Sequence, residues 1–502
     1  MSNPFLGLGF NSWAQKFSKG NVFVAFLQYV TTGSTSSFTL LSTGTVDYEV
    51  DWGDGSTESL TTNAPTHTYS SAGEYTIKVT PAEGSTYRPY FNNVVSDTSI
   101  ASVSGTGGSQ LGTNLSGAWK GASNITSFSS NIDISSVTDF IATWDTCSSL
   151  TSFPVLDTSS GITFFAAWNA CSSLTSFPVL DTSSGTNFRS AWRDCSSLTS
   201  FPVLDTSSGT NFQQTWFGCS SLTSFPLINT SSGTNFNGTW RDCSGLTSFP
   251  LINTSSGTGL TGFSDTWRNC SSLTSFPLIN TSSGTGFNNT WRDCSGLTSF
   301  PLIDTSSGTN FADAWRSCSS LTSFPLIDTS IGTNFNSAWN GCSSLTSFPL
   351  INTSSGTAFN NTWRNCSSLT SFPLIDTSSG ISFAFCWRST SSLTSFPSCD
   401  FSSATSFTFA WSDCSSLTTF PANMFDTTGT LESNAFAQAW ANCALTAQSI
   451  ENILVSLDTN GATNSAVNFN GGTNAAKTTW STAANTAYTN LINKGWSITY
   501  NA

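Results

Sequence analysis

Residues 188–209 read F-R-S-A-W-R-D-C-S-S-L-T-S-F-P-V-L-D-T-S-S-G, and this stretch recurs with small edits from about residue 140 to residue 443. Successive tryptophans are 24 residues apart, except for a step of 27 from Trp240 to Trp267 and one of 29 from Trp411 to Trp440. A fixed period in this range is typical of proteins that stack one structural unit per repeat. The sequence therefore predicts a solenoid of about 13 coils.

The composition limits the classes of partner. Charged residues make up 9% of the 502 residues, the formal net charge is −13, and aromatic residues make up 13%. Nucleic acids and anionic lipids bind to basic surfaces, so neither is an expected partner. The sequence has no apolar run of 18 residues, and membrane insertion is therefore not expected.

Each repeat begins with the pattern F-x-x-x-W-x-x-C. The spacing of Phe188, Trp192 and Cys195 predicts that these side chains share one face of a short helix. The following L-T-S-F-P-V predicts a short parallel strand that points Leu198, Phe201 and Val203 inward and ends at its proline.

Tryptophan and cysteine form two columns of the repeat, and we expect both to be buried structural ladders. Twelve of the 14 cysteines fall in one column. A free cysteine packs as a small hydrophobic side chain, which favours buried free thiols, with disulfides between coils as the alternative. Examples from the two columns are Trp192, Trp216, Trp240, Cys195, Cys219 and Cys243.

Arginine follows the ladder tryptophan in seven repeats. One interpretation is a solvated lattice of Arg and Asp between coils, in which each pair contributes little. The other is a stripe of hydrogen-bond donors that binds acidic or neutral glycans. The arginines of this stripe are Arg193, Arg241, Arg268, Arg292, Arg316, Arg364 and Arg388.

The repeat resembles a known family. Its C-S-S-L-T-S-F and D-T-S-S-G-T segments are similar to those of BspA-like leucine-rich repeats of bacterial surface proteins. The resemblance implies an α/β fold over residues 93–443, a right-handed leucine-rich-repeat solenoid of short parallel strands and short helices.

A second resemblance precedes the repeats. The segments D-Y-E-V-D-W-G-D-G-S (47–56), T-H-T-Y (66–69) and S-A-G-E-Y-T-I-K-V (71–79) resemble the PKD repeat. This resemblance implies an all-β immunoglobulin-like sandwich over residues 21–92, of a kind that serves as a spacer or interaction module in extracellular proteins. Turn geometry accounts for Asp47, Asp51 and Asp54, which leaves calcium as the less favoured reading, and His67 is expected to be structural.

The two ends of the chain differ from the repeats. Residues 1–20 are rich in aromatic residues and glycine, and we expect them to be a docking or anchor segment. Residues 444–502 predict a C-terminal cap with helices over 445–460 and 482–494 and strands over 467–469 and 496–500.

These observations favour a binding protein over an enzyme. The only histidine is isolated, no phosphate-binding loop is present, and the carboxylates are dispersed, so no cofactor, metal or catalytic site is predicted. Both families are typical of adhesins, yet residues 1–20 do not resemble a secretory signal. We therefore expect a phage virion protein, such as a tail fibre, spike or head fibre, exposed on the particle surface.

Its expected partners are other virion proteins, bound through the N-terminal region, and a host surface glycan or protein; a homo-oligomer is also conceivable. One alternative is a bacterial adhesin that is secreted or held at the cell surface. The other is a purely structural decoration protein.

Overall fold

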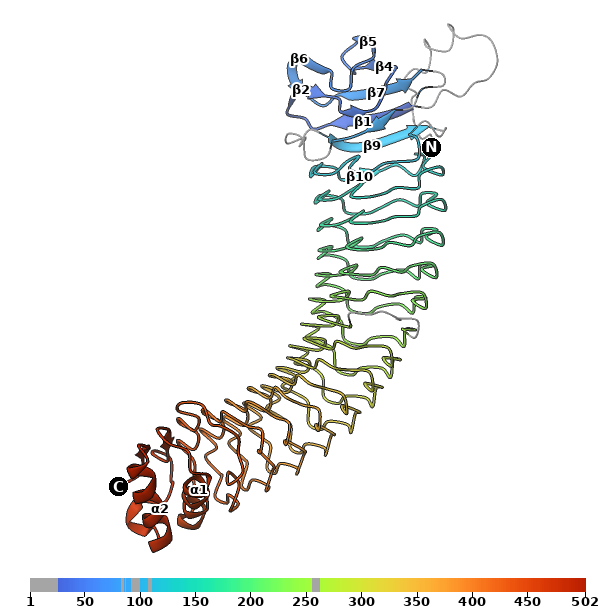
Figure 1. Ribbon diagram of the computed structural model, residues 1–502. Helices are drawn as coiled ribbons and strands as arrows, with labels where there is room; N and C mark the ends of the chain where they lie inside the picture. The colour runs from blue at the N-terminus through green and yellow to red at the C-terminus, as the bar shows by residue number, and fades with distance from the viewer. Residues whose placement is uncertain (1–25, 83–84, 86, 92–99, 107–110, 255–261) are drawn as a thin grey trace, which may run out of the picture.

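The computed structural model describes residues 26–82, 85, 87–91, 100–106, 111–254 and 262–502. A small β domain at the N-terminus leads into a long, curved stack of coils, and two helices lie at the C-terminal end (Figure 1). The docking segment expected over residues 1–20 lies outside the described residues.

The N-terminal domain is built on a six-stranded sheet with the order β10-β9-β1-β7-β4-β5. Its strands are β1 (Phe26–Thr31), β4 (Tyr48–Asp51), β5 (Thr57–Leu60), β7 (Thr76–Pro81), β9 (Ile100–Thr106) and β10 (Ser127–Phe128). Two antiparallel pairs complete the domain: β2 (Thr35–Thr39) with β6 (Thr66–Gly73), and β3 (Ser42–Thr43) with β8 (Arg88–Pro89). Phe38 of β2 and Tyr29 of β1 are both buried with ring centroids 6.2 Å apart, so the β2–β6 pair and the main sheet share one core.

Backbone hydrogen bonds join the β domain to the coils without a break. Strand β9 pairs antiparallel with β1 on one edge and parallel with β10, which belongs to the first coil, on the other. The sheet thus continues beyond residue 92, where the domain was expected to end. An apolar coil end needs a cover, and here the sheet itself covers the first coil.

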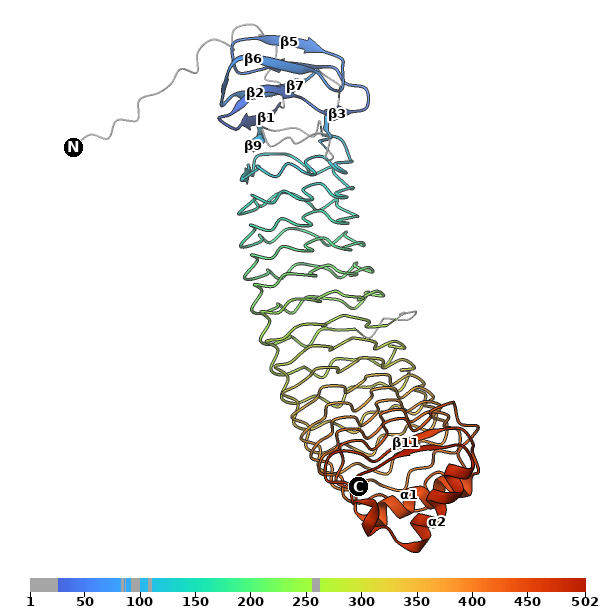
Figure 2. The ribbon, with the colours of Figure 1, turned by 90° about the vertical axis from the view of Figure 1, so that its left-hand side faces the viewer.

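The coils follow one another along the stack (Figure 2), and stacked aromatic rings hold them together. Trp192 lies 5.3 Å from Trp168 and 5.7 Å from Trp216, with rings within 5° of parallel. Phe201 meets the same indole edge-on at 4.9 Å. Such arrangements are favourable beyond the area they bury, and they repeat from coil to coil.

The cysteine column is buried and all fourteen cysteines are free. The Cys195 thiol donates to the carbonyl oxygen of Trp168 at 3.2 Å, and the Cys219 thiol to that of Trp192 at 3.2 Å. Burial raises the pKa of Cys195 to about 12, so the thiol stays protonated and serves as a packing group.

The F-x-x-x-W-x-x-C segment is not a helix, contrary to the sequence prediction. It forms successive turns, in which the N–H of Ala191 bonds to the carbonyl of Phe188 while the N–H of Trp192 bonds to Thr215 of the next coil. Ser190 and Asp194 have φ of 55° and 57°, which no α-helix contains. Alternate N–H groups therefore bond between coils and cannot form the i to i−4 bonds of a helix.

The predicted strand is also different from the observed structure. Leu198, Phe201 and Leu204 are buried, whereas Val203, expected to point inward, is 63% exposed. Burial every third residue is the period of an extended polyproline II-like chain, not the two-residue period of a strand. The coil-to-coil contacts assigned as parallel β-bridges are isolated ones such as Asn187 with Asn211.

The C-terminal end follows the predicted cap closely. It contains α1 (Ala447–Asn460), β11 (Ala466–Asn468), the short 3-10 helix η1 (Lys477–Thr479), α2 (Thr482–Asn493) and β12 (Ser497–Thr499). Thr446 caps α1 by accepting from the Ser449 N–H, and Gly461 ends that helix with φ of 80°. Phe469 lies 5.7 Å from Trp440, so the cap extends the aromatic stack by one ring.

None of the helices in the described part of the chain is long and apolar enough to cross a membrane.

The aromatic stack generates a stability prediction. Trp315 is fully buried between Trp291 and Trp339, and its indole N–H has no hydrogen-bond partner among the described residues. Trp315→Ala should lower the free energy of unfolding by about 3–5 kcal/mol. Trp315→Phe should cost markedly less, because it keeps a ring and loses no hydrogen bond.

Chemical denaturation monitored by circular dichroism measures both effects. Ile331→Ala, a change at an exposed apolar side chain, is the control and should alter stability little. Equal destabilisation by the alanine and phenylalanine variants of Trp315 would contradict this account of the stack.

Candidate ligand-binding surface

The arginine stripe lies on the outside of the turn segments. Each of its arginines directly follows a buried ladder tryptophan, so the rigid stack fixes its backbone while the side chain extends along the surface. The guanidinium groups are half-buried; for example, the side chains of Arg241 and Arg292 are 31% and 24% exposed. The stack thus brings all seven predicted residues onto one face, one per coil.

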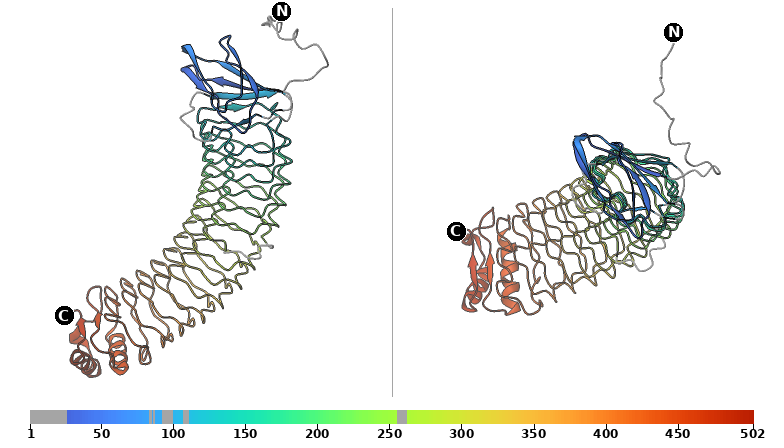
Figure 3. Two further views of the ribbon diagram at one scale, coloured as in Figure 1. Left: turned by 45° about the horizontal axis from the view of Figure 1, so that its top comes forward. Right: turned by 90° about the horizontal axis from the view of Figure 1, so that it is seen from above.

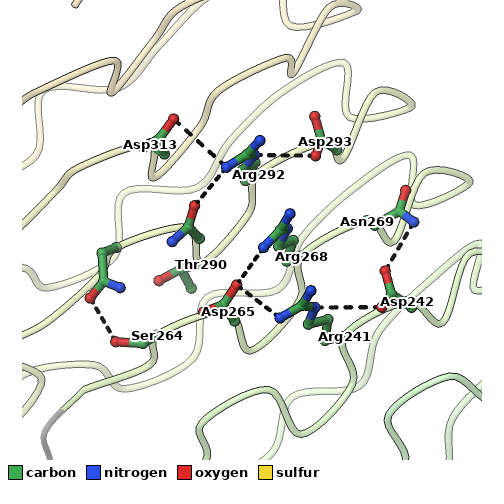
Figure 4. Close-up of polar contacts among 12 residues, drawn as sticks. Arg241, Asp242, Ser264, Asp265, Arg268, Asn269, Thr290, Arg292, Asp293 and Asp313 are labelled. Carbon is green, nitrogen blue, oxygen red and sulfur yellow. Dashed lines mark hydrogen bonds and ion pairs between the residues drawn. The ribbon is translucent and has the colours of Figure 1, made fainter.

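Most of the stripe is neutralised by its own carboxylates (Figure 4). Asp265 lies 3.1 Å from Arg268 and 3.6 Å from Arg241, which belongs to the preceding coil. Arg292 likewise approaches Asp293 at 3.3 Å and Asp313 of the next coil at 4.0 Å. These contacts form the Arg/Asp lattice that was one of the two sequence interpretations.

The remaining pairs extend the lattice toward both ends of the stripe. Arg193 contacts Asp194 at 3.2 Å, Arg316 contacts Asp313 at 2.9 Å and Arg388 contacts Asp413 at 3.1 Å.

Arg364 breaks this pattern. It has no carboxylate within ion-pair distance among the described residues, and its guanidinium donates to Oδ1 of Asn361 at 3.2 Å. Its Nε atom is buried without a hydrogen-bond partner. Burial, followed by the charges of Arg388 and Arg316, lowers the pKa of its guanidinium. An anionic group from outside the chain would relieve this unfavourable environment.

Two phenylalanines lie beside this arginine in an unusual conformation. Phe385 and Phe409 have φ of 60° and 56°, which bulky side chains rarely adopt. Their rings stack 5.0 Å apart and are only partly buried. The guanidinium of Arg364 lies 5.7 Å from the ring of Phe385, and that of Arg388 lies 5.2 Å from the ring of Phe409. The same position has positive φ in the neighbouring coils, and only these two coils fill it with an aromatic side chain.

The residues with positive φ form two columns of the repeat that the sequence prediction did not recognise. They occur two and six residues after the repeat phenylalanine, where the chain mostly carries Asn, Asp, Gly or Ser. These residues tolerate positive φ better than others, so their two columns could have identified the turns. Asp194 and Asp242 belong both to one of these columns and to the Arg/Asp lattice.

A second feature missed at the sequence level is an exposed aliphatic ridge. Its ten members occupy the position after the repeat proline, and each is 60–64% exposed. In the later coils an N–H to carbonyl bond spans this residue, for example from Ile252 to Pro250 at 3.0 Å, which forms a tight turn that pushes Leu251 outward. The ridge consists of Val155, Val179, Val203, Leu227, Leu251, Leu278, Leu302, Leu326, Leu350 and Leu374.

The β domain carries the only histidine of the chain. Its ring stacks on Trp52 at 4.9 Å, and its Nε2 atom lies 2.8 Å from Oδ2 of Asp54. Hydrogen bonds from the Ser56 hydroxyl and then from His67 lower the pKa of Asp54 to about 2. No group of three His, Cys, Asp or Glu residues in the described ranges is arranged to hold a metal ion.

Comparisons with known proteins relate the chain to one domain family and to two solved structures. Residues 23–84 match the PKD domain family. The chain is similar to the crystal structure of a leucine-rich repeat protein from Eubacterium ventriosum, with 14% identity, a TM-score of 0.26, and coverage of 64% of this chain and 89% of that one. It is also similar to the TLR13–ssRNA13 complex, with 14% identity, a TM-score of 0.22, and coverage of 74% and 56%.

No curated protein matches the sequence. The N-terminal domain is thus a PKD-type domain, and the structural neighbours of the chain are leucine-rich repeat proteins.

The low pKa of Asp54 predicts a pH-dependent contribution to stability. Because the folded pKa of about 2 lies below the unfolded value of about 3.9, ionised Asp54 stabilises the fold above about pH 4. This contribution is lost as the pH falls toward 2. Asp54→Asn should therefore weaken the hydrogen bonds around β5 and β6 at pH 5–6, and the difference from wild type should disappear near pH 2.

Hydrogen exchange measured by mass spectrometry on peptides from this region, with variant and wild type compared at each pH, tests this expectation. A difference that is constant from pH 6 to pH 2 would show that the carboxylate charge is not involved.

Proposed function

We propose that this chain is a structural protein of a bacteriophage particle, displayed on its surface as a tail fibre, spike or head fibre and serving as a non-catalytic adhesin. The observation that carries the proposal is the set of fourteen free, buried cysteines. PKD and leucine-rich repeat modules are typical of proteins that act outside the cell. A display protein with this many unpaired thiols fits folding in a reducing cell interior and release by lysis.

Within this proposal the coil stack is a right-handed, BspA-like leucine-rich-repeat solenoid of about 13 coils. The recurring C-S-S-L-T-S-F motif and the continuous aromatic ladders support this assignment. Residues 1–20 bind other virion proteins, and the far end of the stack extends toward the host.

The main alternative is a BspA-like adhesin on the bacterial cell surface or secreted from the cell. Immunogold labelling of purified phage particles distinguishes the two, and we expect label on the particle. Label on uninfected cells and none on particles would favour the bacterial adhesin. Normal host adsorption by labelled particles that lack the coil stack would instead indicate a decoration protein.

We further propose that the host ligand binds where the arginine stripe is irregular. Arg364 supplies an unpaired positive charge, and Phe385 and Phe409 supply an apolar platform next to it. Arg388, already paired with Asp413, completes the group. A carboxylate on a surface glycan would pair with Arg364 while the sugar ring packs on the phenylalanines.

Arg364→Gln should therefore weaken binding of carboxylate-bearing oligosaccharides at least tenfold, because among the described residues Arg364 is the one arginine of the stripe without a carboxylate partner. Arg316→Gln is the matched control, since it changes the same column where Asp313 already pairs with the arginine. Binding of both variants to uronic-acid and sialic-acid oligosaccharides, and to their neutral methyl esters, can be measured by calorimetry.

The control variant should bind like wild type, and the methyl esters should bind more weakly than the free acids. Equal losses in both variants, or equal affinity for acid and ester, would refute this binding site.

A further inference from the structure

The aliphatic ridge is too large to be an ordinary surface feature. Each of its ten side chains exposes 60–64% of its area, and they follow one another from coil to coil. At roughly 100 Å² of apolar surface per residue the ridge presents about 1,000 Å², more than the largest apolar patch of a typical monomer. Patches of this size mark interaction surfaces.

We propose that the ridge pairs with the same ridge of a second copy of this chain, parallel and in register. The first reason is that the ridges of two copies have the same spacing between side chains. A partner that covers one aliphatic side chain per coil must offer apolar groups at the same spacing, and a second copy does so by construction. The five ridge residues of the straight segment named below supply about half of the ridge area, and the rows that flank them must supply the rest of the roughly 800 Å² per partner that a specific interface buries.

The rows that flank the ridge select the parallel orientation. In the coil of Val203 the exposed Ser200 precedes the ridge residue and the exposed Asp205 follows it. The first of these rows is serine in every coil of the ridge, whereas the second row carries either Asp or Asn. In the coils nearest the β domain the acidic row consists of Asp157, Asp181 and Asp205. A two-fold axis along the ridge brings the acidic row of one copy opposite the hydroxyl row of the other.

An antiparallel pair centred on Val203 would instead place Asp205 of one copy against Asp205 of the other, and like charges in direct opposition are destabilising. The acidic row also has capacity to accept new bonds. Oδ1 of Asp205 accepts from the Ser207 N–H at 3.0 Å, whereas its Oδ2 receives no hydrogen bond from the described residues. A serine hydroxyl of the second copy can donate to that oxygen.

The shape of the stack places the contact in its N-terminal half. The coils that follow β10 run along an almost straight axis, whereas the later coils bend away (Figures 1 and 3). Two straight segments can stay in contact over several coils, so Val155, Val179, Val203, Leu227 and Leu251 form the centre of the joint. Parallel pairing brings the two β domains to the same end, as an anchored surface projection requires.

Sedimentation of the full chain tests self-association, and wild type should have the mass of at least two chains. The combined changes Val179→Asn, Val203→Asn and Leu227→Asn should yield a monomer with an unchanged circular dichroism spectrum, because these side chains are exposed within one copy. The control combines Ile162→Asn, Ile331→Asn and Ile381→Asn, which alter exposed apolar side chains outside the ridge. It should remain associated.

Orientation is tested by Val203→Cys. Parallel pairing in register brings this residue opposite its own counterpart, so mild oxidation should give a disulfide-linked dimer. The native thiols are buried and do not compete, provided that samples are denatured in the presence of excess maleimide. Ile331→Cys is the control and should stay monomeric on a non-reducing gel.

A monomeric wild type, an associated ridge variant, or failure of Val203→Cys to cross-link would each overturn the proposal. These results are separate from the proposed function: association of a protein that is absent from phage particles would refute the virion role and leave the ridge contact intact.

Discussion

The hydrogen bonds between turn segments are the constraint on which the rest of the coil stack depends. Alternate N–H groups of each segment, such as those of Phe188 and Trp192, donate to carbonyls of the following coil. This pattern requires residues with positive φ in between, and it forces every coil to repeat the backbone shape of its neighbour. Only then do the indole rings lie parallel at 5.3 to 5.7 Å. The ladder of rings is thus a consequence of the ladder of backbone bonds.

Because every coil repeats the same backbone shape, the side chains inside the stack cannot change in size without disturbing their neighbours. A side chain of another size in the tryptophan column would disturb the coils on both sides, because interiors are close-packed. The indole N–H groups of the ladder have no hydrogen-bond partners among the described residues, a loss that ring burial must outweigh. Variation is therefore confined to the outer surface. The unpaired Arg364 and the two phenylalanines in left-handed conformation are departures of this kind, which is why we place recognition there.

The sequence was sufficient to predict what depends on period and composition. It gave the buried tryptophan and cysteine columns, the PKD-type domain and the two C-terminal helices, because these features follow from which residues recur and at what spacing. It was not sufficient for the backbone of the repeat. The i, i+4, i+7 spacing of Phe188, Trp192 and Cys195 fits successive turns as well as a helix, and hydrophobicity alone cannot separate them. The prediction that Val203 points inward was wrong. The buried residues of this segment, Leu198, Phe201 and Leu204, recur every three residues and not every two.

The sequence predicts the position of the candidate binding surface but not the pairing of its charges. The arginine column can be read from the repeat, but whether each arginine is paired depends on side chains one coil away, such as Asp265 next to Arg241. The chain as a whole carries a net charge of −13 and repels polyanions, while salt screens this field beyond about 8–10 Å. A single arginine without a carboxylate partner then attracts an acidic group only when the two are in direct contact. For this reason the ligand that we propose is an acidic glycan, with isolated acidic groups on a neutral framework, and not a densely charged polymer such as a nucleic acid.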